Sequence, residues 1–251
     1  MPFTFSHPAL IIPLLHARPR HRWLSATGLI TGSIAPDFEK FFRLQLASEY
    51  SHSFASIFYF SCPVALGLAF LFHAVVRQPL LAHLPMPLQR RLGHFARFNW
   101  VAYFREHYYG VLASIIIGAM LHLLWDSFTH RNALGVRLLP LLSETIDWDG
   151  TAIAWFDLLA AISTVTGGIV IVLAVWLMPA RTGRIAPVPP TTMGRYWGLA
   201  ALVTFALLVE WVLVVDPAFL DGSIAAISAT LLGVLVASGY AKRSKLARDR
   251  S

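Results

Sequence analysis

Long uncharged runs of hydrophobic residues divide the chain, and shorter polar or basic segments separate them. A membrane-spanning helix needs about 20 mostly apolar residues. Four runs meet this requirement clearly, and a fifth is slightly shorter but uncharged: Phe54–Val76, Val111–Thr129, Trp155–Met178, Trp197–Val215 and Ser223–Tyr240. The pattern predicts an all-α, polytopic membrane helical bundle with about five full spans.

Two segments outside these runs follow different patterns. The apolar stretches Pro2–His16 and Trp23–Pro36 are each too short to cross a membrane, and a basic turn joins them. We therefore predict a hairpin of two short helices whose open ends lie on the same side of the membrane. In Arg77–Tyr109, basic residues alternate with aromatic residues at helical spacing, which is typical of an amphipathic helix lying in the membrane interface.

The composition supports a single integral membrane domain over residues 1–251. The chain is 57% hydrophobic and only 13% charged, whereas a soluble domain has about 25% charged residues. The net charge of +7 is spread over short loops, which favours membrane lipids as partners and argues against nucleic acid. The single cysteine, Cys62, excludes an intramolecular disulfide.

The basic residues also predict an orientation. The hairpin turn, the Arg77–Tyr109 segment, the proline-rich loop after the third span and the C-terminal tail hold 16 of the 20 Lys and Arg residues. These four segments would share one side of the membrane, and the remaining four basic residues would lie on the other. Because basic loops favour the cytoplasmic side, we predict a bacterial inner-membrane protein with its C-terminus in the cytoplasm.

The stretch HLLWDSFTH ends the second apolar run with titratable residues at a spacing of four. His122, Asp126 and His130 therefore lie on one face of the helix. Ionisable groups within a membrane are costly and mark candidate functional sites. His130 lies about 12 Å from His122 along a straight helix. We therefore expect it to be an outer-shell group, a ligand of a second ion or a proton carrier.

The predicted topology brings other His and Asp residues to the same outer face. His7 lies near the open end of the hairpin's first arm, Asp37 at the end of the second, and His52 just before the first span. Imidazole and carboxylate groups together suit a divalent metal, with zinc the expected ion. The alternative is structural: an isolated His-x-x-x-Asp pair is more often a hydrogen-bonded pair, and the other residues could cap or end helices. Glu210, deep in the fourth span, is a separate candidate for function or for a contact between helices.

The motifs of roughly the first 135 residues resemble those of a known family. MPFTFSHPA, GSIAPDFE, HSF and HLLWDSFTH resemble bacterial membrane proteins grouped as domain of unknown function 4184. Their order is similar to that of predicted membrane-bound metal-dependent hydrolases, which have an early His, a Pro-Asp-x-Asp, a Thr-His-Ser and a His-x-x-x-Asp. The chain departs from that order at Glu39, which replaces the second Asp, and at SEYSHS, which replaces His-Arg-x-x-Thr-His. The resemblance implies five metal ligands: His7, Asp37, His52, His122 and Asp126.

Two hypotheses of function follow. The first is a metal-dependent hydrolase with an outward-facing site, acting on a phospholipid or another lipid-linked ester. Its candidate catalytic residues are Asp37, Asp126 and His130, with an aspartate as general base if it is not a ligand. The second is a non-enzymatic protein, either a transporter of solutes or metal ions or a structural partner. Transporters usually show repeats or broken helices in both halves. Here the polar residues concentrate in residues 1–135, while 155–240 supply further spans, and this asymmetry favours the hydrolase.

Overall fold

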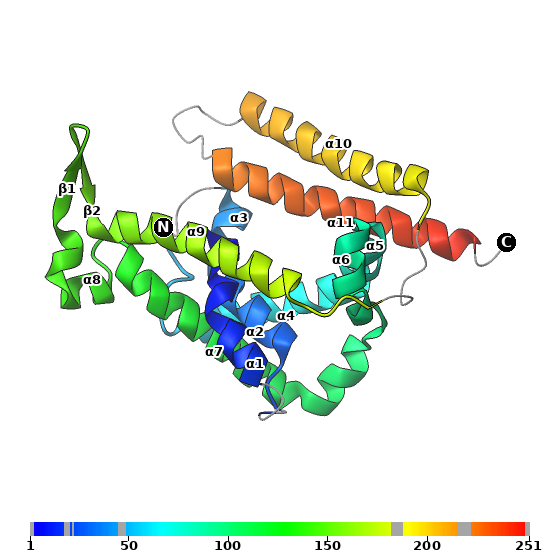
Figure 1. The fold of residues 1–251 in the computed structure, drawn as a ribbon, viewed down its shortest axis with the longest axis horizontal. Helices are drawn as coiled ribbons and strands as arrows, with labels where there is room; N and C mark the ends of the chain where they lie inside the picture. Colours follow the sequence, from blue (N-terminus) through cyan, green and yellow to red (C-terminus); the bar gives the residue numbers. More distant parts are fainter. Residues whose placement is uncertain are drawn as a thin grey trace. The chain divides into compact units, whose positions relative to one another are not determined.

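A computed structural model describes residues 3–17, 21, 23–44, 49–181, 188–214 and 222–248 (Figure 1). It contains five helical segments that are long and apolar enough to cross a membrane. They agree with the predicted spans and confirm the all-α polytopic class. The five segments are Ile57–His83, Trp100–Thr129, Trp155–Trp176, Pro190–Val214 and Gly222–Ser244.

Contacts within the chain define two compact units. The first comprises Met1–Asp37, Glu49–Gly67 and Val101–Ala174, and the second comprises the rest of the chain. Most of the third span belongs to the unit that holds the candidate site. Ser6 packs closely against this span, since an added Cβ at Gly167 would lie 2.7 Å from the Ser6 Cβ.

The first unit begins with short helices: η1 (Thr4–Ile11), α1 (Ile12–Ala17), α2 (Ala26–Ile34) and η2 (Ala35–Asp37). They form the predicted hairpin, since η1 packs against α2. The arginines of its basic turn lie outside the described residues, and the side of the membrane on which the hairpin opens stays a prediction. Ser25 caps α2 by accepting a hydrogen bond from the Gly28 amide at 3.2 Å.

Glycines let α2 contact the backbone of α7 (Trp100–Thr129) directly. Gly28 and Gly32 are four residues apart and therefore share one face of α2. A Cβ at Gly32 would lie 2.2 Å from the carbonyl oxygen of Ile115, and one at Gly118 would lie 2.5 Å from that of Leu29. Small residues at this spacing allow close packing of membrane helices. The packing sets the distance between the end of α2 and the second half of α7.

The segment after α7 contains a β-hairpin that the sequence analysis did not predict. It follows α8 (Leu134–Leu138) and η6 (Pro140–Ser143), and pairs β1 (Thr145–Trp148) with β2 (Thr151–Ala154). Asp149 and Gly150 form the two-residue turn, and both have positive φ angles, of 52° and 78°. The Asp-Gly pair between short β-prone runs is the ordinary signal for such a turn. The third span, α9 (Trp155–Trp176), begins directly after β2.

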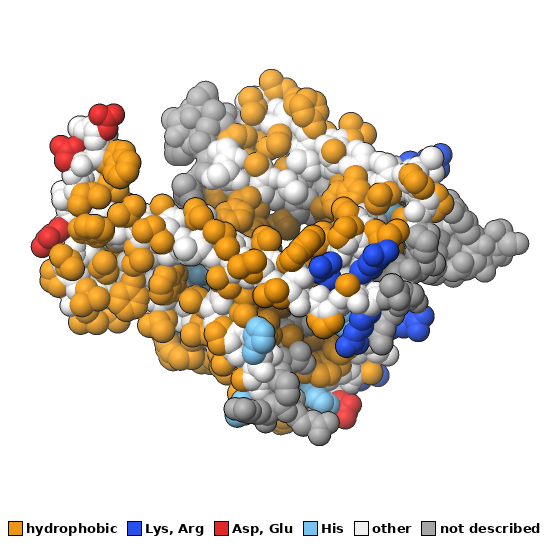
Figure 2. Space-filling model, viewed as in Figure 1, with side chains coloured by type: hydrophobic (Ala, Val, Ile, Leu, Met, Phe, Trp, Pro, Cys, Tyr) orange, Lys and Arg blue, Asp and Glu red, His pale blue; other side chains and the backbone are white. Residues whose placement is uncertain are grey.

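The second unit contains an antiparallel pair of long helices, α10 (Pro190–Val214) and α11 (Gly222–Arg248), which lie side by side in Figure 1. The Tyr196 hydroxyl is 2.9 Å from that of Ser238, and Thr204 donates to the Ala229 carbonyl at 3.3 Å. From the first pair to the second, the residue number rises along α10 and falls along α11, so the two helices are antiparallel. The exposed surface of α10 is largely hydrophobic (Figure 2), as expected for a helix that faces lipid.

The first span and the predicted interfacial helix are both divided into shorter pieces. The span consists of η3 (Ile57–Ser61), α4 (Cys62–Leu71), η4 (Phe72–Val76) and α5 (Arg77–His83), of which η3 and η4 are π-helical. The segment Arg77–Tyr109 forms α5, α6 (Met86–Leu92), η5 (Gly93–Arg97) and the first turns of α7 instead of one helix. Helix α5 ends before Leu84, which is extended with ψ 154°. This break has a local cause, because a residue before proline disfavours the helical conformation.

Candidate metal centre

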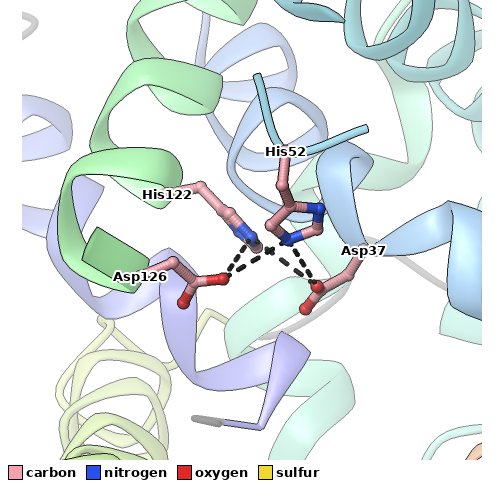
Figure 3. A group of neighbouring side chains, drawn as sticks. All are labelled: Asp37, His52, His122 and Asp126. Atoms are coloured by element: carbon pink, nitrogen blue, oxygen red, sulfur yellow. Dashed lines mark ion pairs between the residues drawn. The ribbon is translucent and has the colours of Figure 1, made fainter. Parts of the chain in front are cut away.

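Four side chains from separate parts of the sequence converge in the first unit (Figure 3). Asp37 ends η2, His52 lies in the loop before η3, and His122 and Asp126 lie one turn apart on α7. Each offers one ligand atom, and these four atoms lie within 4.8 Å of one another. The predicted convergence of these residues therefore occurs in the structure.

The two imidazoles face the two carboxylates across a short gap. The Nε2 atom of His52 lies 3.4 Å from Asp37 Oδ1 and 3.4 Å from Asp126 Oδ2. The Nε2 atom of His122 lies 3.6 Å and 3.3 Å from the same two oxygens. Each nitrogen thus lies beside one oxygen of each carboxylate, as the dashed lines in Figure 3 show.

A backbone hydrogen bond fixes the orientation of the His122 ring. Its Nδ1 atom lies 2.8 Å from the carbonyl oxygen of Ser33, which can only accept. Nδ1 therefore carries the proton in the neutral ring, and Nε2 presents a lone pair to the carboxylates. Histidines that bind metals usually have their other nitrogen held in this way.

The facing atoms of His122 and Asp126 have no hydrogen-bond partner among the described residues. They are Nε2 of His122 and Oδ2 of Asp126, both fully buried. A lone pair facing a buried carboxylate oxygen is unfavourable unless a cation or a proton lies between them. Two imidazole nitrogens and two carboxylate oxygens form a donor set that suits a divalent ion. The residues present therefore fit a metal.

The fifth predicted ligand, His7, also lies at the centre but contacts the other oxygen of Asp126. Its Nε2 is 3.0 Å from Asp126 Oδ1, and its ring stacks on that of His122 with centroids 3.9 Å apart. Thr4, from the same helix η1, donates its hydroxyl to Asp37 Oδ2 at 2.6 Å. Helix η1 therefore holds the outer oxygen of each carboxylate, while the inner oxygens face the centre.

The centre is closed on one side and partly open on the other. His122 and Asp37 have no exposed side-chain surface, whereas the side chain of His52 is 18% exposed and that of His130 is 32% exposed. The Nδ1 atom of His130 lies 3.0 Å from the backbone carbonyl of Asp126 and 3.7 Å from its Oδ2. His130 therefore stands at the open edge of the centre.

The loop that carries His52 is held by its own serines. The Ser51 hydroxyl lies 2.7 Å from Nδ1 of His52, and the buried Ser56 hydroxyl donates to the Ser51 carbonyl at 2.7 Å. The sequence analysis did not identify Thr4, Ser33 or Ser51 as parts of the centre. Ser33 contributes only its backbone carbonyl, so its side chain gives no signal in the sequence.

Two acidic residues considered from the sequence lie outside this group of donors. Glu39, which replaces the second Asp of the resembled motif, pairs with Arg43 at 3.0 Å. Glu210 lines a groove of about 280 Å³ in the second unit, together with Trp211 and Ser228. Neither residue is one of the four donors.

Comparison with known families gives a match over nearly the whole chain. Residues 1–239 match the DUF4184 family, described as a domain of unknown function. The chain belongs to the DUF4184 family. No curated protein and no solved structure matches it. The match extends the resemblance seen in the first 135 residues through α9, α10 and most of α11.

Proposed function

We propose that this DUF4184 protein is a membrane-bound metal-dependent hydrolase whose divalent ion is held by Asp37, His52, His122 and Asp126. One observation carries the proposal: Nε2 of His122 and Oδ2 of Asp126 are buried, lie 3.3 Å apart and have no hydrogen-bond partner among the described residues. A purely structural His–Asp pair would normally share a proton in a well-formed hydrogen bond. Zinc is the proposed ion because the donors are imidazole and carboxylate groups.

The chemistry of the proposed site follows from its open edge. A divalent ion at these donors would act as a Lewis acid on the ester or phosphoryl oxygen of a substrate. Both carboxylates are used as donors, and their outer oxygens are held by Thr4 and His7. We therefore assign the role of general base to His130 rather than to Asp37 or Asp126.

His130 has a suitable position for proton transfer. Donation of its Nδ1 proton to the Asp126 carbonyl leaves Nε2 as the basic atom of the ring. Its partly exposed side chain can exchange a proton with water, in contrast to that of His122. His130 would take a proton from the attacking water at Nε2 and return it to the leaving group.

The substrate that we propose is an amphiphile with an ester or phosphodiester bond, such as a phospholipid or another lipid-linked ester. The support is that His122 and Asp126 lie on α7, a helix of membrane-spanning length and composition. The transporter hypothesis fits less well. Within the described residues, the metal-donor group draws all its ligands from the first unit, while α10 and α11 contribute none.

The experiment that tests hydrolysis compares variants of the full chain in detergent. Short-chain phosphodiester and carboxylic ester amphiphiles would be offered to the wild type, to His130→Ala and to His83→Ala. His83 is a matched control, because it is buried and its Nδ1 is bonded to the Pro79 carbonyl, but it stacks on Tyr196 in the second unit.

We expect the wild type and His83→Ala to hydrolyse at least one class of amphiphile, and a chelator to abolish the reaction. His130→Ala should retain its metal and lose about 10–100-fold in rate, as is typical for groups next to a metal shell. A protein that binds metal but hydrolyses neither class would contradict the hydrolase and favour the transport hypothesis.

A further inference from the structure

Arg77, the first residue of α5, is a buried cation that has no counter-ion among the described residues. The residue is only 5% exposed. Its Nε and Nη1 atoms are buried and have no hydrogen-bond partner among the described residues. The ring of Phe98 lies beside the guanidinium, with its centroid 5.9 Å from the guanidinium carbon. A buried guanidinium with unused donors is costly unless an anion binds it.

The acidic side chains described in the second unit do not fill this role. Glu39 pairs with Arg43, and Glu210 lines the groove with Trp211 and Ala225. A counter-ion for Arg77 therefore does not come from these described acidic residues of the second unit, and a bound anion would supply it. The position of Arg77 along its helix indicates which anion is available.

Arg77 lies at the depth of lipid headgroups if the first span crosses the membrane. The 20 residues 57–76 contain no Asp, Glu, Lys or Arg, and Arg77 is the first charged residue after them. Twenty helical residues span about 30 Å, which is the thickness of the hydrocarbon core. The guanidinium then lies at the level of the phosphate groups.

Lys242 of α11 supplies a second cation at the same end of these helices. The 20 residues 222–241 are also uncharged, and Lys242 follows them. Its Nζ donates to the carbonyl of Ala74 at 2.6 Å. Ala74 belongs to the π-helical turn η4, one turn before Arg77, and π-helical turns are frequent at functional sites. Arg77 and Lys242 thus approach one turn of one helix from two chain segments.

We propose that Arg77 and Lys242 form a binding site for a phosphate group at this edge of the membrane, separate from the metal centre. A guanidinium binds phosphate through two parallel N–H donors, and an ammonium adds a point charge. The headgroup of an anionic phospholipid carries such a phosphate at the depth of Arg77, and free phosphate is the other source. The site would anchor the second unit at the membrane edge.

The test uses the full chain, purified in detergent and depleted of lipid. Three probes would be compared: micelles containing phosphatidylglycerol, micelles in which palmitate supplies the same negative charge, and inorganic phosphate alone. Bound lipid per chain would be counted by native mass spectrometry, and the melting temperature would report binding of inorganic phosphate. The variants are Arg77→Gln, Lys242→Gln and, as a control, Arg90→Gln. Arg90 is exposed on α6 and contacts the sulfur of Met86.

We expect phosphatidylglycerol to be retained by the wild type and by Arg90→Gln. Lys242→Gln should bind about fivefold more weakly, as one cation near a membrane surface contributes about that factor. Arg77→Gln should lose more of its affinity for phosphatidylglycerol than Lys242→Gln does. Lys242 is exposed, so its variant reports on the site even if Arg77→Gln does not fold.

The source of the phosphate is decided by the same data. Stabilisation of the wild type by inorganic phosphate, lost in both variants, would assign a soluble phosphate, whereas retention of phosphatidylglycerol alone would assign a headgroup. If the wild type retained palmitate as well as it retains phosphatidylglycerol, the proposal of a phosphate site would be overturned. Equal loss in Arg77→Gln, Lys242→Gln and Arg90→Gln, or no binding of any probe by the wild type, would also overturn it.

Discussion

Each carboxylate of the candidate metal centre uses its two oxygens differently. Asp37 and Asp126 direct one oxygen to the centre, and they accept hydrogen bonds at the other from Thr4 and His7 respectively. A carboxylate held at its outer oxygen cannot rotate freely, so the inner oxygen keeps its direction. Helix η1 therefore orients ligands without contributing one of the four donor atoms.

The orientation of Asp37 by Thr4 leads to a first prediction. In Thr4→Val the hydroxyl is lost while the volume is nearly kept, so Asp37 Oδ2 loses its buried donor at 2.6 Å. We expect metal affinity to fall about 10–100-fold, measured by competition with a chelating dye. Thr31→Val is the control, since Thr31 is buried on α2 but donates to the backbone carbonyl of Thr27. Equal affinity in the two variants would remove Thr4 from the centre.

The sequence predicted that these four residues converge because their chemistry and spacing are visible in it. His122 and Asp126 share a helix face, and Asp37 and His52 end or precede apolar runs. The supports could not be found in the same way. The Ser33 carbonyl that holds His122 is backbone, and Thr4 is an ordinary hydroxyl until the fold brings it to Asp37.

At the scale of elements, the contact between α2 and α7 decides whether the centre can form. Gly32 precedes Ser33, whose carbonyl holds His122, and Asp37 lies just beyond the end of α2. Any increase in the separation of α2 and α7 would therefore move Asp37 and Ser33 away from His122 together.

A second prediction concerns this contact. In Gly32→Ala the new Cβ would lie 2.2 Å from the Ile115 carbonyl oxygen, so one helix has to shift. Overpacking of this kind costs about 1–3 kcal/mol. We expect a lower melting temperature together with weaker metal binding. Gly67→Ala, on α4, is the matched control because nothing lies within 4 Å of its added Cβ. Normal metal binding in Gly32→Ala would show that the centre does not depend on this contact.

The elements themselves differ in how far the sequence predicted them. The spans were predicted closely, because hydropathy and length are sufficient for a helix that lipid surrounds. The β-hairpin was missed, although Asp149-Gly150 lies between two short runs rich in Thr and Ile. The aromatic and basic periodicity of Arg77–Tyr109 predicted one helix, but Pro85 disfavours the helical conformation at Leu84, and the segment is divided there.

At the scale of the whole molecule, the five helices of spanning length and composition indicate a multi-pass membrane protein, and their orientation stays a prediction. Sixteen of the 20 basic residues lie in segments predicted to share one side. Between the β-hairpin and the C-terminus lie three of the five helices, α9, α10 and α11. If all three helices cross the membrane, the β-hairpin and the C-terminus lie on opposite sides.

The third prediction therefore concerns topology. Reporter fusions at Asp149 and Ser251 should report opposite compartments, with Asp149 outside and Ser251 in the cytoplasm. A fusion within the loop between α9 and α10 serves as an internal control and should agree with Ser251. Finding Asp149 and Ser251 in one compartment would contradict both the number of spans and the outward-facing site.

The most direct test of the metal centre is the metal content of the purified chain. The wild type, His122→Ala and His83→Ala would be purified without chelator and analysed by inductively coupled plasma mass spectrometry. We expect the wild type and His83→Ala to carry stoichiometric divalent metal, with zinc the expected ion, and His122→Ala to have lost it while keeping its helical content. A metal-free wild type that also fails to bind added divalent ions, or a His122→Ala variant with undiminished metal, would contradict the assignment of Asp37, His52, His122 and Asp126 as ligands.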